Sequence, residues 1–195
     1  MDLANKSEFL SNIYVTTDDL KIVECVDNYN KSLSVDINII KRPTHLSDDG
    51  TTTEETLIHA IGELKKRYNY IVLLPPTAPF RRLEDLDGLI KKTINHGADS
   101  GQTISAKKIR IGEFDDLIFQ YTNDSLEINM KNLSLKFYEN SSAYIFKTEV
   151  LIETGRLQGS KNIGYLMDSP FDLDINTQLD WDFAEFIIDK EKYND

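Results

Sequence analysis

The sequence has a single cysteine, five prolines and no long apolar run. Cys25 has no second thiol to pair with and no metal-ligand pattern around it, so we interpret it as a core or near-surface thiol. The longest apolar run, Ile71–Leu74, is far too short to cross a bilayer. The charged residues among the first twenty argue against a secretory signal peptide. These absences predict a cytoplasmic protein without a membrane partner.

Positive charge is also scarce. Lysine and arginine together number 22 against 33 acidic residues, which gives a formal net charge of −11. Non-specific nucleic-acid binding needs a basic surface, so we expect no nucleic-acid partner. A phosphorylated small substrate remains compatible, because a few local cations or a metal ion can hold one. The nine glycines form neither a G-x-G-x-x-G nor a GK[ST] phosphate-binding pattern.

What the sequence does contain is an alternation of short β-type runs with helical ones. This pattern predicts an α/β fold, with a doubly wound, mostly parallel sheet covered by helices. We treat the 195 residues as one domain. The strands are expected at Ile13–Thr17, Asp36–Lys41, Tyr70–Leu74, Gln102–Ala106, Ile118–Tyr121, Ala143–Lys147 and Gly164–Asp168.

Three helices have clear boundaries in the sequence. One begins at the threonines 51–53 and carries Lys65, Lys66 and Arg67 in its expected last turn. A second runs from about Leu83 to His96, where Gly97 can supply a left-handed cap. The last helix begins at Thr177, with Asp180 three residues on as a capping partner.

Polar residues follow three of the expected strands, and open α/β sheets bind their ligands where strands end. Arg42 lies before Asp49 and the threonine-rich helix start, an arrangement that can hold an anion such as a phosphate. The alternative is that the threonines only cap the helix and Arg42 is a solvated loop residue. A second segment, residues 75–82, has three prolines in five residues and fixes Thr77 and Arg81 after a central strand. Sequence alone indicates an ordered loop there.

The third segment contains Asp172, Asp174 and Asn176 at alternating positions. In a strand, all three side chains would point the same way, and a hard cation such as Mg²⁺ would offset their repulsion. The alternative interpretation is a solvated edge strand.

Together these segments resemble the acylneuraminate cytidylyltransferase family, which includes the CMP-sialic acid synthetases. Five blocks match the family's in order and spacing, over roughly residues 13 to 190. The matching blocks are Val15–Asp18 ("VSTD"), Arg42–Asp49 ("RPxxLAxD"), Leu73–Arg81 ("LLQPTSPLR"), Asn140–Tyr144 ("NGAIY") and Asp174–Asp180 ("DIDTxxD").

The resemblance implies a fold of the nucleotide-diphospho-sugar transferase type and a reaction. In the family, CTP reacts with a nine-carbon or related acidic sugar, whose anomeric hydroxyl attacks the α-phosphate, giving a CMP-sugar and pyrophosphate with the help of Mg²⁺. It further implies a homodimer formed through residues 107–168. The implied site residues are Arg42, Asp49, Thr53 and Thr77 for the nucleotide, Thr77, Arg81, Asn140 and Tyr144 for the sugar, Asp174 and Asn176 for Mg²⁺, and Asp174 and Arg42 for catalysis.

The family's first block, a strand followed by an "ARxGSKxxxxKN" loop that grips the triphosphate, has no counterpart here. In a sheet of order 3-2-1-4 that strand lies in the middle. We therefore expect a gap between the strands at Ile13–Thr17 and Tyr70–Leu74, unless the sheet closes differently, another chain supplies the strand, or the sequence is a fragment of a longer protein. An N-terminally truncated family member with impaired activity is the leading hypothesis, and a non-catalytic subunit that pairs with an intact homologue is the alternative.

Three positions depart from the family's chemistry. Asn176 stands where the family has the second aspartate of "DID", and it brings no charge to a cation site. Pro75 replaces the glutamine of "LLQPTSP", and Glu139 lies where the family often has an arginine. A carboxylate there disfavours sialic acid itself, so the sequence leaves the identity of the sugar open.

Overall fold

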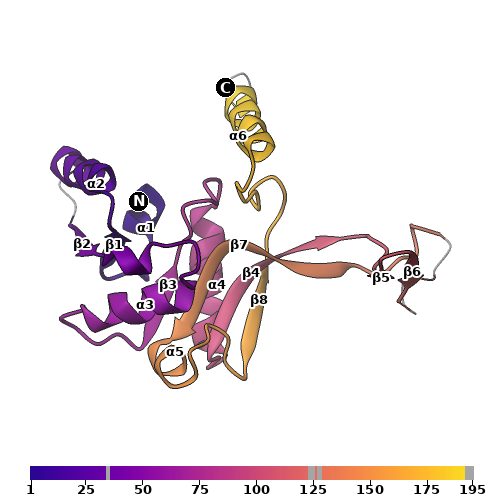
Figure 1. The fold of residues 1–195 in the computed structure, drawn as a ribbon, viewed down its shortest axis with the longest axis horizontal. Helices are drawn as coiled ribbons and strands as arrows, with labels where there is room; N and C mark the ends of the chain where they lie inside the picture. The colour runs from indigo at the N-terminus through magenta and orange to yellow at the C-terminus, as the bar shows by residue number, and fades with distance from the viewer. Residues whose placement is uncertain (34–35, 123–125, 127–128, 192–195) are drawn as a thin grey trace.

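The structure is a computed structural model that describes residues 1–33, 36–122, 126 and 129–191. Its strands form three separate groups (Figure 1). A parallel pair consists of β1 (Ile13–Thr17) and β2 (Ile37–Lys41). A four-stranded sheet has the order β3-β7-β4-β8, with bounds Tyr70–Leu73, Lys136–Lys147, Ser100–Lys107 and Asn162–Leu166. A distal hairpin contains β5 (Gly112–Asp115) and β6 (Ile118–Tyr121).

The strand directions fit the predicted α/β class with one reversal. β7 is antiparallel to both β3 and β4, and β4 is parallel to β8. Therefore β3, β4 and β8 all run one way and β7 alone runs against them. The mostly parallel α/β prediction is confirmed, whereas the reversed strand was not foreseen.

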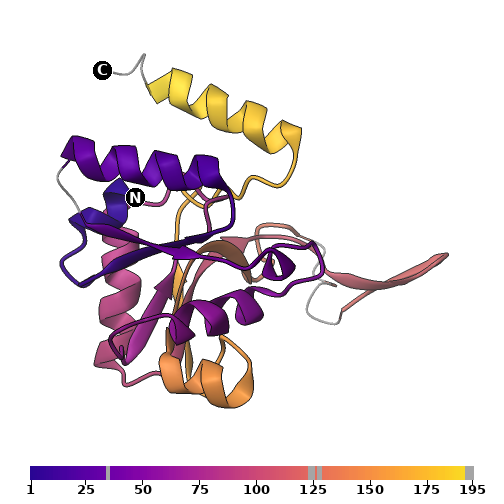
Figure 2. The ribbon, with the colours of Figure 1, turned by 60° about the vertical axis from the view of Figure 1, so that its left-hand side comes forward.

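Helices cover both faces of the four-stranded sheet (Figures 1 and 2). Above β1 and β2 in Figure 2 lies α2, and α6 extends away from the body above it. None of the helices in the described part of the chain is both long and apolar enough to span a membrane. The helix bounds are α1 Asp2–Lys6, α2 Leu20–Leu33, α3 Thr53–Gly62, α4 Leu83–Asn95, α5 Thr148–Thr154 and α6 Gln178–Glu191, with a 3₁₀ turn at Thr44–Leu46.

Two hydrophobic clusters lie on opposite faces of this sheet. Leu86 and Leu89 of α4 pack with Ile145 of β7 on one face. On the other face, Leu57 of α3 and Leu151 of α5 pack with Phe146, the next residue of β7. Because neighbouring strand residues point to opposite faces, one strand contributes to both clusters.

The ends of the helices follow their local sequence. Thr52 caps α3 in a reciprocal capping box with Glu55, as the threonine-rich start indicated. The helix ends at Gly62, however, so the expected last turn at Lys65, Lys66 and Arg67 is wrong. Gly97 has the predicted left-handed backbone, with φ +58°. Thr177 and Asp180 bond at the start of α6, which confirms that cap.

The predicted strand through Asp172, Asp174 and Asn176 is wrong. These residues form a loop before α6. Asp172 Oδ2 accepts a hydrogen bond from the Ser105 hydroxyl at 2.5 Å. Asp174 Oδ2 instead accepts one from the Asn176 amide at 3.0 Å. The alternating polar side chains therefore make hydrogen bonds in a loop, and they do not mark a β-strand.

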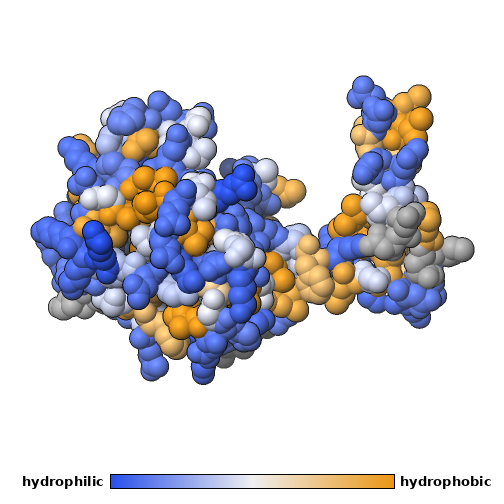
Figure 3. Space-filling view, turned by 90° about the horizontal axis from the view of Figure 1, so that it is seen from below, coloured by the Kyte–Doolittle hydropathy of each residue, from blue (hydrophilic) through white to orange (hydrophobic). Residues whose placement is uncertain are grey.

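A long arm leaves the body (Figures 1 and 3). We define the arm as the distal ends of β4 and β7, which pair through residues 104–107 and 136–139, together with β5 and β6; it overlaps the predicted dimerisation region 107–168. All four residues of β6 are exposed, and Leu117 in the turn is 88% exposed. Further exposed apolar side chains of the arm are Phe114, Ile118, Phe119, Phe137 and Tyr138.

The expected gap in the middle of the molecule is present. In the described residues β1 pairs only with β2, and β3 pairs only with β7. The edges of β1 and β3 are therefore without a partner strand.

Candidate active site

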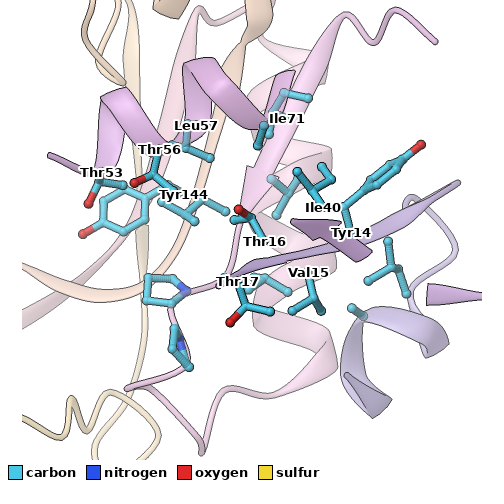
Figure 4. Close-up of a pocket in the computed structure, with 18 of the residues that line it drawn as sticks. Tyr14, Val15, Thr16, Thr17, Ile40, Thr53, Thr56, Leu57, Ile71 and Tyr144 are labelled. Atoms are coloured by element: carbon cyan, nitrogen blue, oxygen red, sulfur yellow. The ribbon is translucent and has the colours of Figure 1, made fainter. Parts of the chain in front are cut away.

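A large open cleft of about 1540 Å³ lies between β1, β3 and the start of α3. Figure 4 shows side chains of β1, β2, α3, β3 and β7 around this space. Six residues that the sequence singled out line it: Arg42, Thr53, Thr77, Arg81, Tyr144 and Asp174. Segments separated by more than a hundred residues therefore meet at one site, at the ends of strands where α/β folds bind ligands.

The proline loop places a cation beside the cleft. The Arg81 guanidinium donates a hydrogen bond back to the Pro75 carbonyl, so the loop closes on itself. Burial lowers the pKa of Arg81 to about 10, which still leaves it charged at neutral pH. Its Nε is buried with no partner in the described part of the structure. Such an unpaired donor is suited to an anionic ligand.

Arg42 reaches the cleft from the segment after β2. Its backbone N–H donates to the Thr17 carbonyl at 2.9 Å, which joins it to the end of β1. Its guanidinium lies 3.5 Å from Asp18, and its Nε has no partner among the described residues. The pKa of Asp18 is lowered, first by the Ser47 hydroxyl and also by Arg42, so this carboxylate stays ionised. Arg42 is therefore held at the cleft with an Nε–H donor that no described group accepts.

Asp174 is positioned by a contact between two loops. The N–H of Ile175 donates to the Thr77 carbonyl at 2.8 Å, which ties the residue after Asp174 to the proline loop. The Asp174 Oδ1 atom is buried, and no described group bonds to it. A buried carboxylate oxygen without a partner is costly unless a ligand or cation completes it. Its position beside the cleft therefore indicates a binding role.

A bulge in β7 lies beside the cleft-lining residues Glu139 and Tyr144. Between the pairs Gln102–Tyr144 and Ile104–Glu139 the register shifts, and Ser141 adopts φ +58°. Thr103 bonds both the N–H and the carbonyl of Ala143, which fixes the bulge. Such bulges often redirect side chains next to active sites.

The bulge brings the Tyr144 hydroxyl to Glu139, to which it donates a hydrogen bond. Burial, followed by this bond, raises the pKa of Tyr144 to about 12. The phenol therefore keeps its proton at neutral pH. The sequence identified Tyr144 but gave no sign that Glu139 would be its partner, because the pairing depends on the bulge.

Three predicted site residues do not line the cleft. Asp49 lies in the turn before α3 and is exposed, while its neighbour Asp48 lines the cleft. Asn176 is exposed and reaches the cleft only through its bond to Asp174. Asn140 is 5% exposed and donates to the Ser105 hydroxyl at 3.0 Å, so its present contacts are internal.

Other lining residues were missed. Lys21 and Gln158 both line the cleft. Lys21 lies two residues after Asp19, the second of the two aspartates that follow β1, which was an available signal, whereas nothing near Gln158 in the sequence indicated it. The acidic residues outnumber the basic ones along the cleft. Its cations are Lys21, Arg42 and Arg81, and its carboxylates are Asp2, Asp48, Glu54, Glu139 and Asp174.

Comparison with known proteins gives relatives along nearly the whole chain. The N-acylneuraminate cytidylyltransferase of Escherichia coli is 24% identical over 98% of this chain. The CMP-N,N'-diacetyllegionaminic acid synthase of Campylobacter jejuni is 26% identical over 95% of it. The resemblance to the acylneuraminate cytidylyltransferases is confirmed. A third relative, the post-translational flagellin modification protein B of Campylobacter coli, is 25% identical over 97% of the chain.

The lengths of these relatives differ. The chain spans 45% of the E. coli relative, and 80% and 81% of the C. jejuni and C. coli proteins. No protein-family model matches the chain.

Solved structures support the fold. A 4-diphosphocytidyl-2C-methyl-D-erythritol synthase from Anaerococcus prevotii superposes with a TM-score of 0.69 at 14% identity, covering 96% of this chain and 83% of that one. A CMP:2-keto-3-deoxy-manno-octonic acid synthetase complexed with CTP gives 0.66 at 13% identity, covering 97% and 86%. This chain therefore has the same fold as these two nucleotidyltransferases.

Proposed function

We propose that the chain carries out, or forms part of a site for, transfer of a cytidylyl group from CTP to an acidic sugar with release of pyrophosphate. The observation that carries the proposal is the convergence of Arg42, Arg81 and Asp174 on one cleft, each with a buried polar atom that lacks a partner in the described structure. The relatives named for CMP-sugar synthesis support the choice of cytidine nucleotide and sugar.

The loop that contains Asp174 and Asn176 suits a magnesium ion. Mg²⁺ is usually bound through one or two carboxylates and completed by substrate phosphates and water. Asp174 offers a free buried Oδ1, and the Asn176 amide that bonds its other oxygen lies next to it. No group of three acidic, histidine or cysteine ligands occurs in the described part of the chain. Asp174 with Asn176 would therefore hold the ion only together with the nucleotide, where it would offset charge on the phosphates.

The remaining residues would bind and orient. A sugar hydroxyl would attack the α-phosphorus of CTP and give up its proton to water, a new phosphorus–oxygen bond would form, and the bond from the α-phosphorus to the oxygen that bridges it to the β-phosphate would break, which releases pyrophosphate. Arg42 and Arg81 would stabilise the negative charge of the phosphates through their unpaired N–H groups. Tyr144, held by Glu139 and protonated at neutral pH, would contact the sugar. Because Glu139 repels a carboxylate in its vicinity, we expect the sugar's acidic group to bind on the Arg81 side.

We expect this chain to bind the triphosphate of CTP weakly. Three cations line the cleft against five carboxylates, and this excess of negative charge repels nucleotide phosphates. We therefore expect the isolated chain to release pyrophosphate more slowly than the E. coli relative under the same conditions.

The proposal is tested by mixing excess protein with CTP, Mg²⁺ and a panel of nine-carbon acidic sugars, and by measuring pyrophosphate. Release should require both CTP and a sugar. Mutation of a residue that hydrogen-bonds to a metal ligand typically changes activity by about 10–100-fold. Asp174→Asn alters a proposed ligand itself, so it should lower the rate by about tenfold or more. Asp27→Asn removes an exposed carboxylate on α2 and should leave the rate unchanged.

Three outcomes would contradict the proposal. These are no release with any sugar of the panel, equal release with ATP in place of CTP, and an unchanged rate in Asp174→Asn. A rate equal to that of the E. coli relative would contradict only the expected weak grip on the triphosphate.

We further propose that the arm joins two copies of the chain. Several exposed aromatic and aliphatic side chains gather on this projecting ribbon, and large exposed apolar surfaces usually mark interaction sites. A copy that contributes little catalysis could then still act as a partner for a more active homologue.

A further inference from the structure

A continuous path of hydrogen bonds joins three polar side chains that do not line the cleft. The Asn140 amide donates from Nδ2 to the Ser105 hydroxyl at 3.0 Å, and that hydroxyl donates to Oδ2 of Asp172 at 2.5 Å. We call these three residues the hydrogen-bond relay. It connects β7, β4 and the loop before α6, three segments that lie far apart in the sequence.

The relay is largely buried and its directions are fixed. Asn140 is 5% exposed and Ser105 is 2% exposed. The Ser105 hydroxyl has one proton, which goes to the Asp172 carboxylate, while its oxygen accepts the amide. Hydrogen bonds to a carboxylate are stronger than those between neutral groups, and consecutive bonds polarise one another. Loss of Asp172 would therefore leave a buried hydroxyl proton without its acceptor and weaken the bond beyond it.

One end of the relay fixes the bulge of β7. Oδ1 of Asn140 accepts the N–H of Ser142 at 3.2 Å, so this side chain spans Ser141, the residue with φ +58°. Glu139 and Tyr144 lie on either side of this stretch, line the cleft and bond to each other. Asn140 therefore acts on the shape of the backbone that carries the proposed sugar contact.

The other end of the relay holds the loop that carries Asp174. Asp172 and Asp174 line a second pocket of about 650 Å³, and Asp174 lines the large cleft as well. Residues 172–175 are only half-buried, so hydrogen bonds contribute much of what fixes this loop. Asp172 is tied to β4 through Ser105, and the N–H of Ile175 is tied to the Thr77 carbonyl.

We propose that Asp172, Ser105 and Asn140 are positioning residues that hold the Asp174 carboxylate in a fixed place relative to Tyr144. They act on the cleft through the loop and the bulge, because none of the three lines it. Asn140, which the family resemblance assigned to the sugar, has this internal role instead. The kinetic part of this inference rests on the proposed function, whereas the structural part does not.

The structural part is tested by amide hydrogen exchange, read residue by residue by NMR on the full chain without any ligand. Asp172→Ala removes the acceptor of the Ser105 hydroxyl at a half-buried loop position. The Ser142 N–H lies at the far end of the relay and should exchange about threefold or more faster, as expected when a buried hydrogen bond is weakened. The Ile175 N–H should change in the same direction, because the loop has lost its tie to β4.

Two further variants separate the hydrogen bond from the charge. Asp172→Asn keeps a side-chain carbonyl that can accept the Ser105 hydroxyl, so it should retain most of the protection. Asp168→Ala is the matched control, because Asp168 is an exposed carboxylate of the same second pocket. Its removal leaves the bond between Ser105 and Asp172 in place, and both N–H groups should keep their wild-type rates.

The kinetic part uses the pyrophosphate assay with CTP, Mg²⁺ and a sugar that the wild type accepts. Asp172→Ala should lower kcat by about tenfold, the lower end of the effect typical for residues that position a metal ligand. Asp172→Asn should stay within about threefold of the wild type, because the Ser105 hydroxyl keeps an acceptor. A direct metal ligand would lose as much in Asp172→Asn as in Asp172→Ala, so the two variants distinguish positioning from ligation.

Three results would overturn the proposal. These are an unchanged Ser142 exchange rate in Asp172→Ala, an equal acceleration in Asp168→Ala, and an Asp172→Asn variant as impaired as Asp172→Ala. They would indicate, respectively, that the relay does not connect the loop to the bulge, that loss of any carboxylate from the pocket has this effect, and that the charge of Asp172 is what matters. A wild type that releases no pyrophosphate would contradict the proposed function alone, since hydrogen exchange still decides the relay.

Discussion

Asp99 lies before β4 and accepts three hydrogen bonds. Lys147 at the end of β7 donates to its Oδ1 at 2.9 Å, and Ser160 and the N–H of Lys161 donate to its Oδ2. These contacts, with Lys147 the largest, hold the pKa of Asp99 well below its ordinary value. A single carboxylate therefore connects β7, β4 and the segment that leads into β8.

This depressed pKa makes stability depend on pH. A carboxylate with a lowered folded-state pKa stabilises the fold above its unfolded pKa of about 3.9, and the contribution is lost as pH falls through the folded value. Asp99→Asn should therefore be less stable than the wild type at neutral pH, and the difference should shrink below about pH 4. Urea unfolding across acidic and neutral pH measures this. A difference that stays constant with pH would show that Asp99 acts without its charge.

At the scale of elements, the bulge in β7 depends on one left-handed residue. Ser141 has φ +58°, a conformation that disfavours side chains by about 1–2 kcal/mol. Ser141→Gly should remove that strain, and after the extra unfolded-chain entropy of glycine it should stabilise the protein by about 0.5 kcal/mol. The family pattern "NGAIY" has glycine at the equivalent position.

Ser142→Gly is the matched control, because Ser142 is fully buried and has no positive φ. That change should destabilise by about 0.5–1 kcal/mol. Chemical denaturation of the two variants separates the cases. If Ser141→Gly were the more destabilising of the two, the Ser141 side chain would contribute more than its strain costs.

The elements that sequence predicted well have local causes. The strands at Ile13–Thr17 and Ile118–Tyr121 and the capped start of α3 depend on neighbouring residues, and they appear as expected. The strand prediction for residues 172–176 was wrong because an alternation of polar and apolar residues also fits a loop. In this loop the polar side chains bond to Ser105 and to each other.

Long-range features were harder to predict. β7 runs on to Lys136, well beyond the expected Ala143 start, and its direction depends on partners far away in sequence. The cleft residues Arg42, Arg81 and Asp174 were found because motifs marked them. Glu139 as the partner of Tyr144 was not found, because a register shift across two strands brings them together.

The whole molecule has more surface than a compact monomer of its size. Its accessible surface is 13065 Å², whereas a compact protein of 22.4 kDa would have roughly 9,400 Å². The open cleft, the arm and α6 are the parts that extend from or divide the body (Figures 1 and 2). An excess of this kind is typical of a subunit whose surfaces are covered in an assembly.

Size-exclusion chromatography with light scattering tests the proposed role of the arm. Two chains of 22.4 kDa give 44.8 kDa, the mass expected for the wild type. Phe137→Asp places a charge on the exposed arm and should shift the mass toward a single chain. Leu20→Asp, at a more exposed residue on α2, should not. A wild type that is monomeric at every concentration would contradict the arm as an interface.

The start of α6 has a mechanical consequence for the cleft. Asp180 of α6 accepts hydrogen bonds from the N–H groups of Asn176 and Thr177, and Ile175, the residue before Asn176, donates its N–H to the Thr77 carbonyl. Asp174 therefore lies on a short hinge between a rigid proline loop and a helix whose Trp181, Phe183 and Phe186 face solvent. A partner that binds those aromatic side chains would move α6 and, through this short connection, shift the Asp174 carboxylate relative to the cleft.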